Sequence, residues 1–331
     1  MMKKFLLIAL TVILSLGAFA CTPKEEGCKH EFGQTQAFYT IKESGDTEEI
    51  YSAKICTVCD QTVMQEKVSG QIVSKQTEAS SKIQAANTGD VVYFKKSAYK
   101  EIRLFKALDG ITFYGEDGST INKISFESEN GCKNVTIKNF TFDTYDYGGI
   151  IFNCAVDGIS IIDCSFNWCV HIADKDGSTP PQLKNLTIKD CKFKTIYRSP
   201  NARLSALRLQ KVENFTISGC EFDDVEFNAM QLGNTALTGI VKIEGNTFKN
   251  IGSRVIRLVK NQSASCDIVS NTFYDNTDLE NSDGIYIHCG GGNCKLGANN
   301  WEKMPSFNEQ EFLGFNQGYL TFDMAEQILL G

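Results

Sequence analysis

One short phrase recurs six times in the chain, as NVTIKNFTF (134–142), GISIIDCSF (158–166), NLTIKDCKF (185–193), NFTISGCEF (214–222), IVKIEGNTF (240–248) and CDIVSNTF (266–273). Each copy ends in Phe, and successive Phe residues lie 24, 27, 29, 26 and 25 residues apart. A repeat of this length is typical of a solenoid, in which each copy forms one coil that stacks on the next.

Within each phrase apolar and polar residues alternate, as around Val135 and Ile137, which is the period of a β-strand with one buried face. A coil of this length has room for two such strands and their bends, but not for a crossover helix. Successive coils are therefore expected to stack as parallel strands about 4.8 Å apart. Two residues before each repeated Phe lies a bend that fits only a small polar group or an aromatic such as Phe140, and the Asn side chains at this position are expected to hydrogen-bond along the ladder. In the other copies the position holds Cys164, Cys191, Cys220, Asn246 and Asn271.

These phrases, and the run SSKIQAANTGDVVYFKKSAYKEIRLFKALDGITFYGEDGSTI (80–121), resemble right-handed parallel β-helix proteins of the pectate-lyase-like superfamily. The resemblance implies an all-β fold, a right-handed parallel β-helix (solenoid) over residues 78–300. A short helix at 78–87 is expected to block the open end of the core, where an uncapped coil would expose unpaired backbone groups. The resemblance implies no single reaction, because the superfamily includes lyases, hydrolases, esterases, epimerases and adhesins.

The amino terminus has the features of an export signal. Lys3 and Lys4 precede an apolar run at 5–16 that is too short to span a bilayer and is typical of a secretory signal peptide. The next residues, 18–21, resemble a bacterial lipobox in which Cys21 is lipidated; plain secretion is the alternative. The run 24–26 resembles the surface-export signal of some Bacteroidota lipoproteins, or is an ordinary solvated tether. We therefore expect a lipid anchor at Cys21 and a cell-envelope location, in the outer membrane.

A small module is expected between the tether and the solenoid. Cys28 and His30 are followed by Cys56 and Cys59, with strand-like stretches at 37–41 and 49–54 between the pairs. Three thiolates and one imidazole can close a tetrahedral, structural zinc site, and the pattern resembles a zinc-ribbon-like module of bacterial surface proteins. Disulfides are the alternative in an exported protein. His30 favours zinc, because a disulfide needs no neighbouring His.

These features divide the chain into a signal peptide (1–20), a tether (21–27), the zinc-ribbon-like module (28–68), a linker (69–77), the β-helix (78–300) and a carboxy-terminal cap (301–331). The net charge of −7 argues against a broad nucleic-acid surface. Any anion site must therefore be local.

The candidate binding face lies on the second strand of each coil. If apolar pairs such as Leu207/Leu209 face the core, the residue between them faces outward. Arg208 and Arg257 then lie two rungs, or about 10 Å, apart along the axis, a spacing comparable with a disaccharide repeat. The outward row is Ile151, His171, Arg208, Gln231, Arg257 and Tyr286, and the flanking row is Asn153, Ala173, Gln210, Gly233, Val259 and His288.

Two guanidinium groups at this spacing are suited to the carboxylates or sulfates of an extended acidic glycan, with other polar residues of the two rows as substrate-binding candidates. A lyase acting on uronic acids needs a group that neutralises the carboxylate and a base that removes the C5 proton. Arg208 or Arg257 could neutralise, and His171, Lys211 or Lys260 could act as base. The alternative is a solvated polar face. The substrate-binding candidates are Gln210, Gln231, Tyr286 and His288.

Acidic clusters offer candidates for calcium, which some superfamily members use, although solvated bends are the alternative. Asp223 and Asp224 also resemble the paired acids of polygalacturonase-like hydrolases, but the accompanying Gly-His-Gly and Arg-x-Lys motifs are missing. We therefore favour a polysaccharide-binding lipoprotein, with cleavage by β-elimination or a non-catalytic adhesive or structural role as the open alternatives. The calcium candidates are Glu221, Asp223 and Asp224, or Asp275, Asp278, Glu280 and Asp283.

The module generates the first prediction. We expect purified protein to contain one zinc ion per chain, bound by the four residues named above, and we expect chelation to unfold the module because the metal supplies its folding free energy. Elemental analysis measures the zinc. Protein without zinc and with a mapped Cys56–Cys59 disulfide would contradict the site.

Overall fold

The computed structural model describes residues 32–42, 47–56, 62–175, 179–197, 204–259, 263–274, 287–289 and 293–300. The chain divides into two compact units, residues 1–39 with 51–67 and residues 40–50 with 68–331. Three strands, β1 (Phe32–Lys42), β2 (Glu48–Cys56) and β3 (Thr62–Val68), form a small sheet of order β1-β2-β3. None of the helices in the described part is long and apolar enough to cross a membrane.

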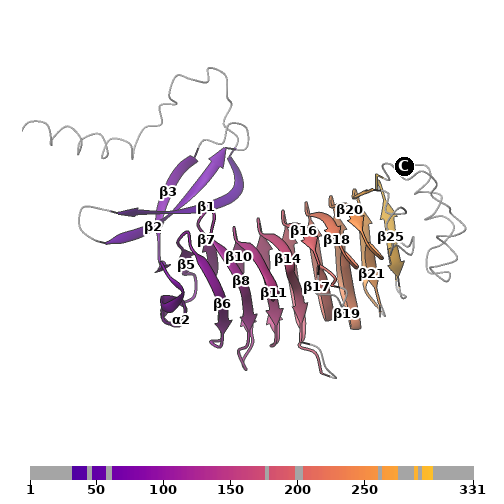
Figure 1. The fold of residues 1–331 in the computed structure, drawn as a ribbon, viewed down its shortest axis with the longest axis horizontal. Coiled ribbons are helices and arrows are strands. Elements are labelled where there is room, and N and C mark those ends of the chain that lie inside the picture. Colours follow the sequence, from indigo (N-terminus) through magenta and orange to yellow (C-terminus); the bar gives the residue numbers. More distant parts are fainter. Residues whose placement is uncertain are drawn as a thin grey trace, which may run out of the picture. The chain divides into compact units, whose positions relative to one another are not determined.

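The remaining strands form one 22-stranded sheet that is wound into a solenoid of about eight coils, and Figure 1 shows the coils following one another in sequence order. The pairings given for this sheet are parallel, each strand lying between equivalent strands of neighbouring coils. The solenoid strands are β4 (Gly70–Val73), β5 (Val91–Phe94), β6 (Ala98–Leu104), β7 (Thr112–Gly115), β8 (Thr120–Phe126), β9 (Cys132–Lys133), β10 (Thr136–Lys138), β11 (Thr141–Phe152), β12 (Val156–Asp157), β13 (Ser160–Ile162), β14 (Ser165–Asp174), β15 (Leu183–Lys189), β16 (Lys192–Ile196), β17 (Leu207–Ser218), β18 (Glu221–Val225), β19 (Met230–Glu244), β20 (Thr247–Ile251), β21 (Ile256–Leu258), β22 (Ser265–Val269), β23 (Thr272–Phe273), β24 (Ile287–Cys289) and β25 (Asn293–Gly297).

The six repeated Phe residues form a continuous stack in the core, as their spacing predicts. Their ring centroids lie 4.7, 4.7, 4.6, 5.1 and 5.2 Å apart from Phe142 to Phe273, and all five contacts are stacked. These separations are close to the spacing of paired strands, so the backbone ladder sets the ring contacts. Each of these side chains is fully buried.

The Asn residues that lie two residues before a repeated Phe form a buried hydrogen-bond ladder, which confirms the prediction for them. The Asn246 backbone N–H donates to Asn271 Oδ1 at 2.9 Å, and the Asn271 N–H donates to Asn299 Oδ1 at the same distance. The Asn271 Nδ2 also donates to the Ile243 carbonyl oxygen at 2.8 Å. Asparagine thus satisfies backbone groups that the bend removes from the sheet ladder.

The bend before each first strand requires a left-handed backbone. Asn134, Asn185 and Asn214 have φ between 50° and 58°, and Gly158 and Gly239 occupy the same bend with φ of 73° and 75°. A Cβ at Gly239 would lie only 2.2 Å from Asn214 Oδ1. Every copy named above therefore has either Asn or Gly at this bend, because both residue types tolerate a left-handed backbone.

The amino-terminal end of the solenoid begins earlier than the sequence predicts. The strand β4 pairs in register with β5, so the stretch 69–77, expected to be a linker, contains a solenoid strand. The helix α2 spans Gln76–Ala85, where we expected residues 78–87. Its Ile83 is buried and packs in the same cluster as the core. The expected cap at 301–331 lies outside the described residues.

The Asn ladder generates the second prediction. In Asn271→Ala, the Asn246 N–H loses its acceptor in a fully buried position, so we expect the free energy of unfolding to fall by about 1–3 kcal/mol. Lys249→Ala, on the exposed side of β20, is the matched control and should leave stability unchanged. Thermal unfolding followed by circular dichroism measures both. Equal midpoints for the two variants would contradict a structural role for the ladder.

Candidate functional site

The predicted polar row exists on the second-strand ladder, but two of its members are displaced. Arg208 pairs with Gln231 and Gln231 with Arg257, so the two arginines lie two rungs apart, as predicted. Ala173, not His171, pairs with Arg208. His288 pairs with Arg257, the place predicted for Tyr286. The outward row in the structure is Ile151, Ala173, Arg208, Gln231, Arg257 and His288.

The physical reason for this error is the period of a β-strand. A shift of one residue would bury the arginines, but a shift of two residues keeps the same side chains outward and changes only their neighbours. The apolar pattern of β14 and β24 therefore could not distinguish the two registers. Gln210 also differs from its predicted role, because it is buried and its Nε2 donates to the Lys175 carbonyl oxygen at 2.8 Å. Tyr286 and Lys260 lie outside the described residues.

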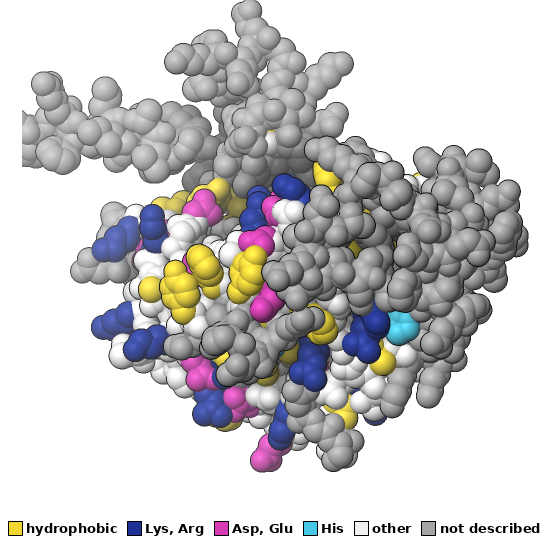
Figure 2. Space-filling model, turned by 45° about the vertical axis from the view of Figure 1, so that its right-hand side comes forward, with side chains coloured by type: hydrophobic (Ala, Val, Ile, Leu, Met, Phe, Trp, Pro, Cys, Tyr) yellow, Lys and Arg dark blue, Asp and Glu magenta, His cyan; other side chains and the backbone are white. Residues whose placement is uncertain are grey.

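Cationic side chains gather at the carboxy-terminal end of this ladder. Arg254 Nη1 donates to His288 Nδ1 at 3.1 Å, and Arg257 Nη1 donates to Gln231 Oε1 at 3.4 Å. Arg208 is exposed on the adjacent rung of β17. Figure 2 shows Lys and Arg side chains beside a His side chain on the displayed side of the molecule. Arg254 was missed in the sequence because it precedes β21 and belongs to neither predicted row.

Amide side chains lie between the arginines. Asn228 Nδ2 donates to Gln231 Oε1 at 3.1 Å and to Ser205 Oγ at 3.3 Å, and Gln231 Nε2 donates to Asn234 Oδ1 at 2.7 Å. Asn228 is almost completely buried, and its Oδ1 has no hydrogen-bond partner among the described residues. A buried acceptor without a donor is costly, so this carbonyl oxygen is suited to accept a hydrogen bond from a bound water.

Aromatic side chains are exposed at the bulge that precedes the second-strand ladder. The Tyr145 ring lies 5.1 Å from the Trp168 ring, and their side chains are 77% and 38% exposed. The strand β11 has a register shift between Thr144 and Gly148, which displaces the intervening residues from the regular ladder. Bulges of this kind redirect side chains. The sequence signal that could have found this cluster is the pair of Tyr residues just before Gly148-Gly149, in a coil that is otherwise regular.

His171, the first candidate base, is covered by the Tyr147 ring. Its side chain is only 2% exposed, and the Tyr147 ring packs edge-on against it at 4.5 Å. A Cβ at Gly149 would lie 2.0 Å from the His171 carbonyl oxygen, so only glycine allows this close approach. The structure therefore places the imidazole on the predicted face but covers it.

The described residues do not bring the metal-ligand candidates together into one site. Among these residues, no group of three or more Cys, His, Asp or Glu could hold a metal ion. Asp223 accepts a hydrogen bond from Asn250, Asp224 accepts one from Tyr197, and Glu221 pairs with Lys194 at 3.1 Å. The loop acids 275–283 lie outside the described residues. Of the four zinc candidates, only Cys56 is described, and it is buried at the end of β2; the zinc and calcium sites stay predictions.

Comparison with known proteins identifies the family. Residues 81–301 match the family model described as the right handed beta helix region. The chain belongs to the right-handed β-helix family. No curated protein matches the chain.

Three solved structures are similar to parts of this chain at low sequence identity. ORF18 of Geobacillus virus E2 has a TM-score of 0.40 and 11% identity over 76% of this chain, which spans 65% of the viral protein. PfbA, a surface adhesin of Streptococcus pneumoniae, has a TM-score of 0.46 and 13% identity, covering 70% of this chain and 76% of the adhesin. An alginate lyase from Paenibacillus has a TM-score of 0.43 and 11% identity, covering 72% of this chain and 96% of the lyase.

A buried carboxyl group lies at the edge of the β-helix face. Asp174 Oδ2 accepts a hydrogen bond from the Gln210 backbone N–H at 2.8 Å, whereas its Oδ1 has no hydrogen-bond partner among the described residues. Burial raises the pKa of Asp174 to about 6, against the lowering effect of the backbone donors. The carboxyl group thus gains a proton on folding between its unfolded and folded pKa values.

This carboxyl group generates the third prediction. Between about pH 4 and 6 the unfolded chain is ionised at Asp174 while the folded chain holds the proton, so stability falls as pH rises through this window. Asp174→Asn keeps an acceptor for the Gln210 N–H and cannot ionise. We expect wild-type stability to fall relative to this variant by up to about 3 kcal/mol from pH 4 to 6. Thermal midpoints measured across that range test this, and parallel pH curves would refute it.

Proposed function

We propose that this face of the β-helix binds an extended acidic polysaccharide without cleaving it. The observation that carries the proposal is the pair Arg208 and Arg257, two rungs apart, with the largely buried Gln231 between them and an amide cluster beside them. Each of these groups has a distinct partner on a charged sugar chain.

The arrangement is linear, as an extended ligand requires. The ladder runs from the rung of Ile151 to the rung of His288 in five steps, or about 24 Å at the spacing of parallel strands. This length exceeds a single sugar and suits an oligosaccharide segment aligned with the solenoid axis. A flat or short ligand would leave one end of the face unused.

The side chains of this region offer three kinds of contact to a sugar chain. Guanidinium groups bind carboxylates or sulfates through paired N–H donors, and Arg254 and Arg257 lie close enough to other polar groups to be held in place. Amide groups such as that of the partly exposed Asn234 exchange hydrogen bonds with hydroxyl groups. Aromatic rings such as those of Tyr145 and Trp168 can cover the apolar C–H face of a sugar ring. The local positive charge contrasts with the net charge of −7 and confines anion binding to this region.

Binding without cleavage is favoured by the position of His171. Removal of a proton from C5 of a uronic acid requires a base that touches the sugar. The His171 imidazole is 2% exposed and lies beneath Tyr147, so a sugar on this face would meet the tyrosine first. An adhesive role at the cell envelope is consistent with the expected signal peptide and lipid anchor at Cys21, which the sequence alone supports.

The fourth prediction concerns the arginines. Arg208→Ala and Arg257→Ala should each weaken binding to alginate or polygalacturonate by about 1.5–3 kcal/mol, because each removes a charge-assisted contact. Both affinities should decrease with added salt, and neutral dextran should not bind. Isothermal titration calorimetry measures the affinities, and the double variant should keep its thermal midpoint because Arg208 is exposed and Arg257 partly so.

Arg103→Ala is the matched control for these variants. Arg103 projects from the same ladder four rungs before Arg208, and its guanidinium is paired with the Glu127 carboxylate. The Arg103→Ala variant should bind the glycans with the same affinity as the parent protein. Unchanged binding by the Arg208/Arg257 double variant would remove this face as the binding site. Growth of absorbance from an unsaturated uronic-acid product would instead show lyase activity and overturn the non-catalytic assignment.

A further inference from the structure

Exposed aromatic side chains gather at one bend of the solenoid, between the first and the second strand of each coil. Tyr145 and Tyr147 lie within β11, Trp168 lies within β14, and Tyr197 directly follows β16. These strands pair in that order, so three successive coils carry the four exposed rings. Phe227 lies at the same bend of the next coil and is partly exposed. These five residues form an aromatic row that follows the solenoid axis over four coils.

Trp168 is presented by a backbone conformation that favours other residue types. The bend places Trp168, Asp224 and Asn250 at equivalent positions, each directly after a residue of one first-strand row. All three have a left-handed backbone, with φ of 63°, 62° and 53°. Asp and Asn tolerate this conformation, whereas a bulky residue rarely adopts it, because its Cβ crowds the backbone. The fold alone therefore does not explain a Trp here, and strained residues of this kind cluster at ligand-binding sites.

Contacts within the protein hold the rings of the aromatic row in place. The Tyr145 ring lies against the Trp168 ring, with 5.1 Å between the centroids. The Tyr197 hydroxyl donates a hydrogen bond to the Asp224 carboxylate. Rings that are already ordered lose little further freedom when a ligand binds, so more of the contact energy appears as affinity.

We propose that the aromatic row selects a 1,4-linked uronic-acid chain whose sugars are joined by equatorial bonds, with successive sugars stacked on successive coils. This inference rests on the acidic-glycan binding proposed above and names the class of glycan. A sugar with equatorial linkages belongs to a flat chain and exposes its C–H groups on two faces, which aromatic rings cover. The length of one sugar is close to the coil spacing of about 4.8 Å. An axially linked chain is buckled and does not present neighbouring sugars flat along one line of rings.

The bend continues from the aromatic row to a cationic side chain. The Ser253 backbone N–H donates to the Phe227 carbonyl oxygen at 3.1 Å, which aligns the bends of these two coils, and Arg254 is the next residue. Arg254 Nη1 lies 3.1 Å from His288 Nδ1. A uronic-acid chain on the aromatic row therefore reaches a guanidinium group at one end, where a carboxylate finds a partner. An uncharged apolar partner would gain nothing from this cation.

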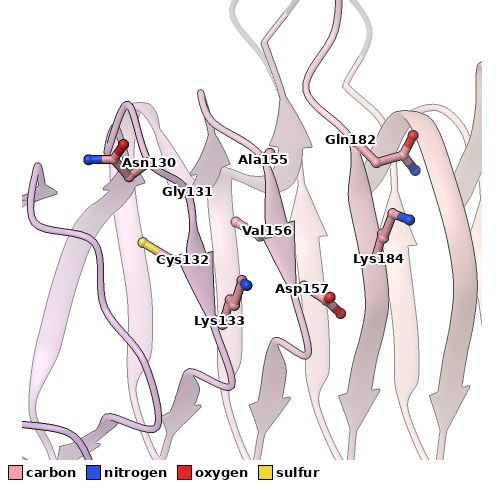
Figure 3. Close-up of a pocket in the computed structure, with 9 residues that line it drawn as sticks. All are labelled: Asn130, Gly131, Cys132, Lys133, Ala155, Val156, Asp157, Gln182 and Lys184. Atoms are coloured by element: carbon pink, nitrogen blue, oxygen red, sulfur yellow. The ribbon is translucent and has the colours of Figure 1, made fainter.

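A pocket at a different corner of the solenoid does not offer the same fit. It has a volume of about 190 Å³ and is lined by residues of β9, β12 and β15 (Figure 3). Typical ligand pockets have volumes of roughly 300–1,000 Å³, so this one suits only a single small group. The ammonium group of Lys184 in its lining is already paired with the Glu213 carboxylate at 2.8 Å. An extended chain therefore finds its contacts on the aromatic row, and the pocket provides a control site.

The fifth prediction compares two uronic-acid chains that differ only in the configuration at C5. Polymannuronate has equatorial linkages, and polyguluronate has axial linkages. At equal chain length, the parent protein should bind polymannuronate about tenfold more tightly, as expected for one or two stacking contacts. Trp168→Asn should lose this preference and keep its affinity for polyguluronate, because the variant removes the ring and suits the left-handed backbone. Isothermal titration calorimetry measures both affinities.

Thermal unfolding separates a lost contact from a lost fold. The midpoint of Trp168→Asn should equal or exceed that of the parent protein, because Asn relieves the strained backbone. Phe105→Ala and Lys133→Ala are the matched controls, and both should keep the preference for polymannuronate. Phe105 is an exposed ring outside the aromatic row, packed 4.8 Å from the Arg103 guanidinium, and Lys133 lines the pocket.

The inference is overturned if the parent protein binds the two chains equally, or if Trp168→Asn keeps the preference. Weakened binding of both chains by Arg208→Ala and Arg257→Ala would in that case still support acidic-glycan binding, so the two failures are distinguishable. Binding of neither chain would contradict the acidic-glycan function itself. Sedimentation of the parent protein, but not of Trp168→Asn, with phosphatidylcholine vesicles would make the row a membrane contact and would also overturn the inference.

Discussion

The parallel backbone ladder between successive coils is the constraint on which the rest of the structure depends. Once Phe142 pairs with Phe166, and Phe166 with Phe193, every residue of these coils has a partner at the same height on its neighbours. Identical side chains then stack at the spacing of the strands, Phe on Phe in this column and Ile on Ile in the column that runs through Ile137, Ile161 and Ile188. The core therefore consists of columns, and each column accepts only a few residue types.

The columns also explain how polar groups survive in the core. Asn246 and Asn271 bond to each other, to the backbone of the preceding coil and to the next Asn, so each buried amide is satisfied by its neighbours. A single Asn in a column of apolar residues would lack these partners and would be destabilising. The change from Cys at 220 to Asn at 246 is tolerated because the Cys220 N–H donates to Asn246 Oδ1 at 2.9 Å. Polar residues are thus stable in a run but not alone.

The sequence predicts which residues face the core, but not always which residues pair between successive coils. The Phe spacing defines the coil, and the alternation of β17, β19 and β21 correctly places Arg208, Gln231 and Arg257 in one row. Where a long insertion precedes a strand, as before Leu207, the alternation of apolar residues cannot distinguish two strand registers that differ by two residues. The predicted ladder positions of His171 and His288 were wrong for that reason. The aromatic cluster was missed because a bulge has no periodic signal.

The same logic explains where the proposed binding face lies. In a solenoid each coil contacts only its neighbours, so a residue outside the columns can change without disturbing the stack. Long strands such as β17 and β19 carry the binding face, where the register holds Arg208 and Gln231 at a fixed spacing. The two-residue strands β9 and β12 hold their corner with few ladder bonds. Strand length thus decides how firmly the side chains of one coil are held in line with those of the next.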